Sequence, residues 1–325
     1  MRNVVTPTVS VLMPAFNHEK FVQQAVRSIW DQKVKDIELI AIDDGSRDTT
    51  PRLLQELAAV SPIPMRVTVQ ANAGVSSTLN RALARARGEW VTVLASDDYY
   101  GPDFLKRNLE VARDHGRMDI AQHSDAFLVD HEGRITGTLD SVSVLAPLQG
   151  DAFDLLATGG GRLLPISMFA RRDLLASIGY CDEALVNEDY DLHLRLARVA
   201  KFEYINEPLV SSRYTPGSFG KQPWRFGSSV ITALEKHEDL LGDRLPEILR
   251  ERALTIASGC FEYGRPAHGL VWDVRALHYS HTPALKVQSV LSGVKGALVG
   301  LSRYALTAII GREKLVRLKR RMTRR

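Results

Sequence analysis

Four short apolar segments alternate with helix-forming segments in the first hundred residues, and this alternation limits the possible folds most strongly. The apolar segments are residues 9–13, 37–42, 65–70 and 91–95. Apolar runs of this length are typical of strands that are buried on both faces. Strands that alternate with helices, here predicted over 19–31, 48–57 and 76–86, predict an α/β fold with a doubly wound, mostly parallel, Rossmann-like sheet. Gly88 is expected to end the third helix.

Polar side chains follow three of these strands, at the edge of the sheet where the strands end. Asn17 follows the first strand, Asp43 and Asp44 the second, and Asp97 and Asp98 the fourth. Ligands of open α/β sheets bind at this edge, and paired carboxylates suit a divalent cation that also holds a phosphate. The alternative interpretation is acidic turns that cap the following helices. No G-x-G-x-x-G follows the first strand and no P-loop motif occurs, which disfavours dinucleotide-binding and P-loop proteins.

Composition and charge narrow the class of protein further. The 325 residues allow one large domain or a domain with an appended module, and the two cysteines, Cys181 and Cys260, fit a reducing compartment. The N-terminus has no apolar stretch long enough for a signal peptide, so we expect a cytoplasmic protein. Residues 285–325 carry a net charge of +10, which leaves about −6 for the rest of the chain. This asymmetry argues against nucleic acid as the partner of the body of the protein.

The strand ends, in this order, resemble a known family. VSVLMPAFN, IELIAIDDGSRDTT, NAGVSSTLNRALARARGEW with VTVLASDD, and GYCDEALVNEDYDLHLRLA resemble the successive signatures of the family 2 glycosyltransferases with the GT-A fold. The resemblance covers residues 8–218, about two thirds of the chain. It implies an inverting enzyme that uses a nucleotide-sugar donor and a divalent cation, Mn²⁺ or Mg²⁺.

The resemblance also implies roles for residues of the donor site. Pro14, Ala15 and Asn17 would lie along the nucleotide, and Asp44 would accept a hydrogen bond from the base ring N–H. A carboxylate accepts only from a donor, so Asp44 favours uracil or thymine. Gly74 and Asn80 would flank the donor pocket, and Asp97 would contact the ribose or sugar hydroxyls. Asp98 would bind the metal.

Two positions depart from the family pattern near the metal. Ala95 stands where many relatives have a further Asp, and Thr215 stands where many have a His that completes the metal coordination. The third protein ligand is therefore absent or comes from elsewhere. Arg213, near Thr215, is a candidate for neutralising the charge of the diphosphate.

The catalytic carboxylate is expected at the start of the helix in NEDYDLHLRLARVA. Leu192, Leu196 and Val199 predict one apolar stripe, which places Glu188 and Asp189 at the helix N-terminus. A plain capping role would also explain acids there. The resemblance assigns Asp189 as the general base, because inverting transfer needs one base to take the proton of the attacking hydroxyl.

Together these patterns predict a GT-A catalytic domain over 1–222, with a nucleotide-sugar half at about 1–100 and an acceptor half at about 101–222. A helical extension follows over 223–284, and then a basic tail over 285–325, either amphipathic on an anionic membrane or disordered. The expected function is transfer from a UDP-sugar to a glycan or lipid-linked hydroxyl acceptor in synthesis of a cell-surface polysaccharide or glycolipid. The alternatives are a nucleotidyltransferase and a non-catalytic nucleotide-sugar-binding protein.

Overall fold

The structure is a computed structural model that describes residues 7–186, 188–214 and 222–280, together with 285–287, 290, 291, 294 and 298. Its internal contacts divide the chain into two units, Met1–Pro216 and Gly217–Arg325. The predicted domain limits, including the boundary at 222/223 and the two halves of the catalytic domain, stay predictions.

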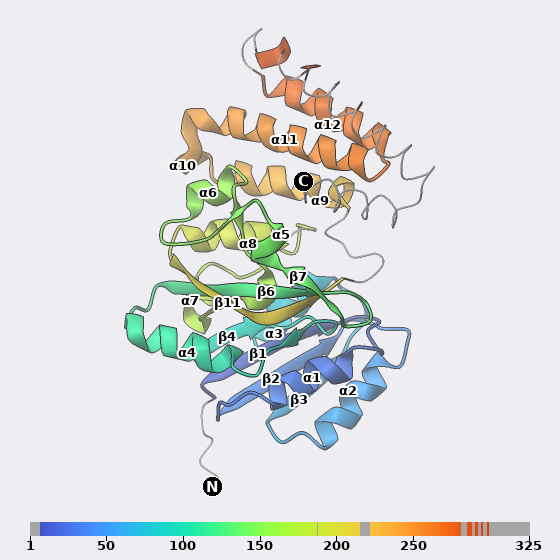
Figure 1. Cartoon of the computed structure of the whole chain (residues 1–325), viewed down its shortest axis with the longest axis vertical. Coiled ribbons are helices and arrows are strands. Elements are labelled where there is room, and N and C mark those ends of the chain that lie inside the picture. Colours follow the sequence, from blue (N-terminus) through green and yellow to red (C-terminus); the bar gives the residue numbers. More distant parts are fainter. Residues whose placement is uncertain are drawn as a thin grey trace, which may run out of the picture. The chain divides into compact units, whose positions relative to one another are not determined.

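Unit 1 is built on one large mixed sheet (Figure 1). Within the described residues it has nine strands in the order β3-β2-β1-β4-β10-β6-β11-β5, with β7 paired to β6. The four predicted strands are present and parallel: β1 (Val9–Ala15), β2 (Ile37–Asp43), β3 (Met65–Val69) and β4 (Trp90–Val93). The remaining strands are β5 (Tyr99–Tyr100), β6 (Ile120–Val129), β7 (Ile135–Thr138), β10 (Phe169–Arg171) and β11 (Lys201–Arg213).

The helices between the first four strands determine the strand order, and with it the position on the sheet edge where a ligand can bind. The chain moves outward through α1 (Val22–Trp30) and α2 (Thr50–Ala59), and it then returns over the sheet through α3 (Val75–Leu83) to β4. Since such crossovers are right-handed, α1 and α2 cover one face and α3 covers the other. The strand order therefore reverses direction between β1 and β4. The ends of these two strands form the switch point where α/β folds bind ligands.

Gly88 has a different role from the predicted one. The helix α3 already ends at Leu83, five residues earlier. The Gly88 N–H donates to Ser10 Oγ at 2.8 Å, and a Cβ on Gly88 would lie 2.5 Å from the Ser10 nitrogen. The glycine is needed because the backbone of the α3–β4 connection approaches β1 closely.

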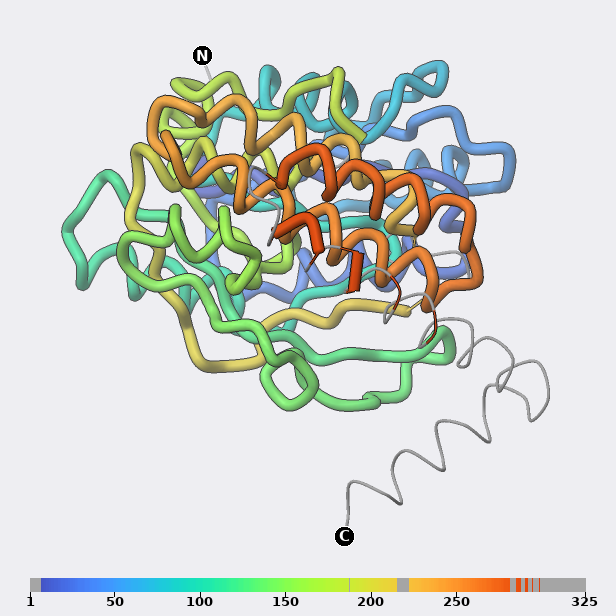
Figure 2. The backbone as a smooth tube through the Cα atoms, turned by 90° about the horizontal axis from the view of Figure 1, so that it is seen from above, coloured from blue at the N-terminus to red at the C-terminus, as the bar shows by residue number. Residues whose placement is uncertain are grey.

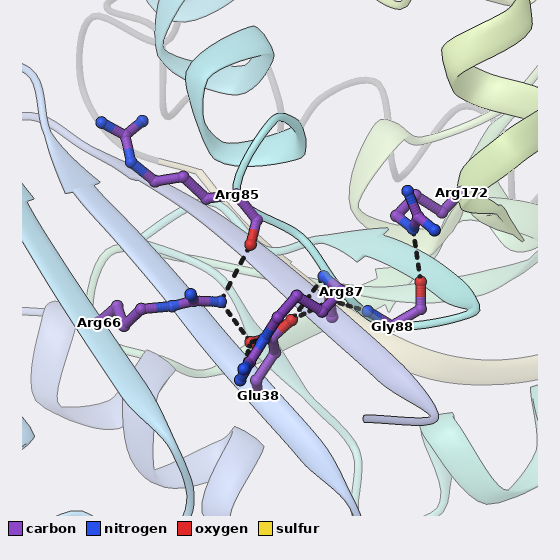
Figure 3. A network of polar contacts seen from close by, with 7 residues as sticks. Glu38, Arg66, Arg85, Arg87, Gly88 and Arg172 are labelled. Carbon is purple, nitrogen blue, oxygen red and sulfur yellow. Dashed lines mark hydrogen bonds and ion pairs between the residues drawn. The ribbon is translucent and has the colours of Figure 1, made fainter. Parts of the chain in front are cut away.

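A buried carboxylate fixes this connection at the amino ends of the strands, away from the ligand edge (Figure 3). Glu38 of β2 is fully buried and accepts hydrogen bonds from Ser10 Oγ at 2.7 Å and from the Arg87 N–H at 2.8 Å. The guanidinium groups of Arg66 and Arg87 pair with its second oxygen. Burial would raise the pKa of Glu38, but these hydrogen bonds and charges outweigh burial and lower it. The network ties β1, β2, β3 and the segment before β4 together.

Antiparallel and mixed pairing extends the sheet beyond the predicted parallel half. β10 pairs antiparallel with both β4 and β6, and β11 runs parallel to β6 and antiparallel to β5. Trp90 of β4 stacks on Phe169 of β10, with ring centroids 5.1 Å apart. The other elements of unit 1 are α4 (Phe104–His115), α5 (Leu139–Val142), β8 (Ala146–Pro147), α6 (Phe153–Ala157), β9 (Gly161–Arg162), η1 (Pro165–Ser167), α7 (Arg172–Ser177) and α8 (Glu188–Ala197).

The apolar stripe predicted for α8 is correct in part. Leu192 and Leu196 are buried, but Val199 lies beyond the end of the helix and is 44% exposed. His193 is buried, and Asp191 is also buried and pairs with Arg195 one turn later. Burial of Leu194 as well shows that α8 is covered on more than one side.

Unit 2 is helical in its described part, as predicted. Its elements are α9 (Pro223–Glu235), α10 (Glu238–Leu241), η3 (Gly242–Arg244), α11 (Leu245–Glu262) and α12 (Pro266–His278). The helices α11 and α12 run side by side (Figures 1 and 2). Gly269 of α12 permits this close packing on α11, because a Cβ there would lie 2.7 Å from Phe261. Gly227 of α9 likewise lies against α12, where a Cβ would be 2.6 Å from Trp272. No helix among the described residues is long and apolar enough to cross a bilayer.

Candidate functional site

The loops that follow β1 and β2 lock onto each other. Asn17 has a left-handed backbone (φ 55°), and its side-chain oxygen accepts the Arg47 N–H at 2.8 Å, while its own N–H donates to Ser46 Oγ at 2.8 Å. Asp43 is fully buried and accepts the backbone N–H groups of Gly45 and Ser46. Asp43 therefore shapes the turn after β2.

Asp44 brings three of the predicted donor-site positions together. Its N–H donates to the Ala15 carbonyl at 2.8 Å, and its carboxylate accepts the N–H groups of Ala73 at 2.7 Å and Gly74 at 2.9 Å. Gln70 donates to the same carboxylate at 2.8 Å. Asp44 thus holds the loop between β3 and α3 against the end of β1. Its contact with a base remains a prediction, and Pro14, one residue before Ala15, lies within β1.

Gly74 begins α3 with φ 85°, and a Cβ on it would meet no atom within 4 Å. The glycine is therefore required by its left-handed backbone and not by crowding.

His18, which the sequence analysis did not single out, connects the end of β1 to the end of β4. Its Nδ1 lies 2.8 Å from Oγ of the buried Ser96, and its Nε2 lies 3.7 Å from Asp97 Oδ2. Its N–H also donates to Thr50 Oγ1 at 2.9 Å. No sequence signal separates such a histidine from a surface one, because its partners are about eighty residues away in the chain.

Asp98 is a buried carboxylate, 8% exposed, beside the charge of Asp97. Burial first, and then the charge of Asp97, raise the pKa of Asp98 to about 8. The N–H of Arg213 donates to Asp98 Oδ1 at 2.6 Å and offsets part of this cost. A cation next to Asp98 would offset the rest.

The residues around Asp98 fit a divalent cation that is shared with a diphosphate. Asp98 offers carboxylate oxygens, which Mg²⁺ and Mn²⁺ prefer as ligands, and Asp97 adds negative charge beside it. In the described part of the chain, no group of three or more His, Cys, Asp or Glu is arranged to hold a metal. Cations that also bind substrate phosphates need only one or two protein carboxylates, so Asp98 fits this kind of site. Thr215, the position of the expected third ligand, lies outside the described residues.

The guanidinium of Arg213, the candidate for neutralising the diphosphate, is engaged within the protein. Arg213 is only 7% exposed, and its guanidinium donates to the Asp97 carbonyl at 2.9 Å and to Gln24 Oε1 at 2.8 Å. The ring centroid of Phe21 lies 4.7 Å from the guanidinium carbon. These contacts within the protein occupy the group.

The acidic pair at the start of α8 has raised pKa values. Glu188 and Asp189 are partly exposed, and Asp189 Oδ1 accepts the Tyr190 N–H at 2.7 Å. Burial raises the pKa of Asp189, and burial together with the charge of Asp189 raises the pKa of Glu188 to about 7. A carboxylate with a raised pKa is a stronger base near neutral pH, which suits the role predicted for Asp189.

Asn80 positions the segment before α8, and its side-chain amide has little hydrogen-bonding capacity left for a nucleotide-sugar. Its side-chain amide donates to the Cys181 carbonyl and to Glu183 Oε1, both at 2.9 Å, and its oxygen accepts the Cys181 N–H at 3.0 Å. The neighbouring Ser76 of α3 contacts the Leu185 carbonyl at 3.5 Å. Through α3, the Gly74 loop is therefore linked to the segment that leads to Glu188 and Asp189.

Comparison with known sequences agrees with this geometry. A family model described as Glycosyl transferase family 2 matches residues 10–138, which contain β1 to β7 and the Asp97–Asp98 pair. This match, the curated relatives and the structural neighbours below support a family 2 glycosyltransferase. It is 24% identical over 268 residues to the uncharacterized glycosyltransferase RP339 of Rickettsia prowazekii, covering 81% of this chain and 79% of that protein. It spans only about a third of the length of several other curated relatives. The family match and the glycosyltransferase relatives support a glycosyltransferase enzyme, which disfavours both alternatives left open above.

Solved structures share the GT-A fold. TarS residues 1–349 from S. aureus, crystallised with UDP-GlcNAc, superimposes with a TM-score of 0.66 at 17% identity and covers 92% of each chain. The mannosyltransferase PcManGT from Pyrobaculum calidifontis, in complex with GDP-Man and Mn²⁺, gives a TM-score of 0.55 at 14% identity and covers 91% of this chain and 87% of that one. At these identities the likeness establishes the fold class of this glycosyltransferase and nothing finer.

Proposed function

We propose that this glycosyltransferase is an inverting, metal-dependent enzyme that moves a sugar from a UDP-sugar to a hydroxyl acceptor. The observation that carries the proposal is Asp98, a buried carboxylate at the switch point of the sheet with a like charge beside it. A buried acid that is left without a full counter-charge costs stability. Such an arrangement is expected where a cation and a diphosphate complete the site.

The donor site consists of the loops that Asp44 holds together. Ala15 ends β1, Asn17 follows β1, and Gly74 lies in the loop between β3 and α3. Each lies in or next to the hydrogen-bond network of Asp43 and Asp44. In our proposal Asp44 accepts the ring N–H of uracil at Oδ2, where its contacts with Gln70, Ala73 and Gly74 leave a lone pair available. TarS, which shares the fold, was crystallised with UDP-GlcNAc, and this supports a UDP-sugar as the first donor to test.

The chemistry divides between two carboxylate groups. When bound at Asp98, with Asp97 at the ribose or sugar hydroxyls, the cation would stabilise the charge of the leaving diphosphate. Asp189 takes the proton of the acceptor hydroxyl as that oxygen attacks the anomeric carbon. Asn80 and Ser76 hold the segment that carries Asp189, so they position the base.

The acceptor in this proposal is a glycan or a lipid-linked sugar of a cell-surface polysaccharide or glycolipid, reached from the cytoplasm. The support is the basic sequence of residues 285–325, which suits an anionic membrane surface. Most of that segment lies outside the described residues, so its membrane contact rests on sequence alone.

A donor panel tests the proposal. The purified chain is incubated with UDP-, GDP- and dTDP-sugars, with Mn²⁺ or with EDTA, and release of nucleoside diphosphate is measured. We expect hydrolysis of one or more UDP-sugars that requires Mn²⁺. Release that is equal in EDTA would contradict metal dependence, and release from GDP-sugars alone would contradict the role of Asp44.

A further inference from the structure

Arg213, the last residue of β11, meets Asp98 where the β5–β11 ladder ends. Within the ladder, Val210 lies opposite Tyr100 and Ser211 lies opposite Tyr99. Beyond this pairing the Arg213 N–H donates to the side-chain Oδ1 of Asp98 at 2.6 Å, so a carboxylate takes the place of a strand carbonyl. The conformation of Asp98 therefore depends on where the end of β11 lies.

The side chain of Arg213 fixes the end of β11 to three other parts of the sheet edge. Its guanidinium donates to the Asp97 carbonyl, to Gln24 of α1, and to the Asp130 carbonyl at 3.2 Å in the turn after β6. The rings of Phe21 and Tyr99 lie 4.7 and 5.7 Å from the guanidinium carbon. A planar group with donors in fixed directions is required to make these contacts at the same time.

We propose that Arg213 is a positioning residue that holds Asp98 ready to bind the cation. The inference rests on the proposed function, in which Asp98 is the metal ligand. A buried carboxylate beside Asp97 is stabilised by turning toward solvent, since solvation lowers the cost of its charge. The Arg213 N–H and the contacts to Asp97 oppose that movement. Residues that orient metal ligands without touching the metal commonly change affinity about 10- to 100-fold when they are replaced.

The first test compares Arg213→Met with Arg213→Lys in metal-free, full-length protein. Methionine keeps most of the length of the side chain and removes all its donors, while lysine keeps the charge but cannot donate to Gln24, Asp97 and Asp130 together. We expect faster amide hydrogen exchange in the peptide over residues 96–101 for both variants. The matched control is Arg134→Met in the turn after β6, which removes an equal charge close to Asp130. Arg134 is exposed and forms ion pairs with Asp130 and Glu132, two side chains of that turn.

The second readout is calorimetric titration of UDP with and without Mn²⁺. We expect the Mn²⁺-dependent gain in UDP affinity to fall about tenfold in both Arg213 variants and to be unchanged in Arg134→Met. Wild-type behaviour of Arg213→Lys would overturn the inference, because it would show that the charge alone is needed. Unchanged exchange over residues 96–101 would also overturn it.

Two further variants separate the possible failures. Should Arg213→Met fail to fold, Gln24→Met removes one acceptor of the guanidinium, and we expect a smaller change in the same direction; no change in that folded variant would contradict the inference. If Asp98→Ala leaves the Mn²⁺-dependent affinity unchanged, the proposed metal site is wrong. In that case the exchange rates still decide whether Arg213 orders the Asp98 segment.

Discussion

Among single residues, Asp189 carries the proposed proton transfer. Burial raises its pKa, and its carboxylate lies at the N-terminus of α8, where it accepts the Tyr190 N–H. We expect Asp189→Asn to lower kcat for sugar transfer or donor hydrolysis by roughly a hundredfold or more, the usual range for loss of a general base. UDP affinity, measured by calorimetry, should stay close to wild type. Glu188→Gln is the matched control and should cost only a few-fold; near-normal turnover of Asp189→Asn would remove this residue from the mechanism.

Asp98 is the second residue whose removal has a specific expected result. Asp98→Ala should abolish most of the Mn²⁺-dependent gain in UDP affinity, because no third protein ligand lies among the described residues. Calorimetry with and without Mn²⁺ measures this gain directly. Asp103→Ala, which removes a partly exposed acid five residues later, should leave it unchanged. Equal UDP affinity in the presence and absence of Mn²⁺ for the wild-type protein would contradict the metal assignment.

At the scale of elements, the Glu38 network joins three strands and the α3–β4 connection far from the site (Figure 3). Glu38→Gln should lower the free energy of unfolding by about 2 to 4 kcal/mol, since it leaves Arg66 and Arg87 without their buried partner. The urea midpoint of the full chain measures the loss. Glu89→Gln removes an exposed carboxylate from Arg171, which keeps Asp173 as a second partner, and should cost less than about 1 kcal/mol.

The same network makes a prediction about pH. The pKa of Glu38 is lowered in the folded protein from an ordinary value of 4.5, so its stabilisation is complete above that pH. As pH falls below 4.5 and through the folded pKa, the carboxylate is protonated and the stabilisation is lost. The difference in stability between wild type and Glu38→Gln should therefore shrink below pH 4.5. A constant difference down to pH 3 would show that the charge of Glu38 contributes nothing.

For the whole molecule, the basic tail is the feature that would decide where the enzyme works. Residues 312–325 carry a net charge of +7, and they lie outside the described residues. Truncation after Gly311 should abolish binding to vesicles of anionic lipid at low salt and leave donor hydrolysis in solution unchanged. Raising the ionic strength should have the same effect, because charges are screened within about 8 Å at physiological salt. A full-length protein that ignores anionic vesicles at low salt would refute the membrane contact.

The sequence alone predicted the elements whose signal is local. The apolar runs that form β1, β2, β3 and β4 alternate with helices. A short continuous apolar run is the usual sequence pattern of a parallel strand that is buried on both faces. Asn17, Asp44, Asp97 and Asp98 became candidates because strand ends in such a sheet share one edge, whereas Gly74 became one through the family resemblance. Their relation to a family added the role of Asp189, which the position of an acid at a helix start does not provide by itself.

Only the tertiary structure decided which residues support these side chains. His18 meets Ser96 and Asp97, Arg213 meets Gln24 and Asp98, and Asn80 holds Cys181. The two residues of each pair lie between 78 and 189 positions apart in the chain. The insertion of β10 between β4 and β6 is of the same kind, because antiparallel pairing of distant strands leaves no periodic signal. Local sequence fixes the period of an element and the polarity at its end, whereas the partner of a buried polar group depends on packing across the sheet.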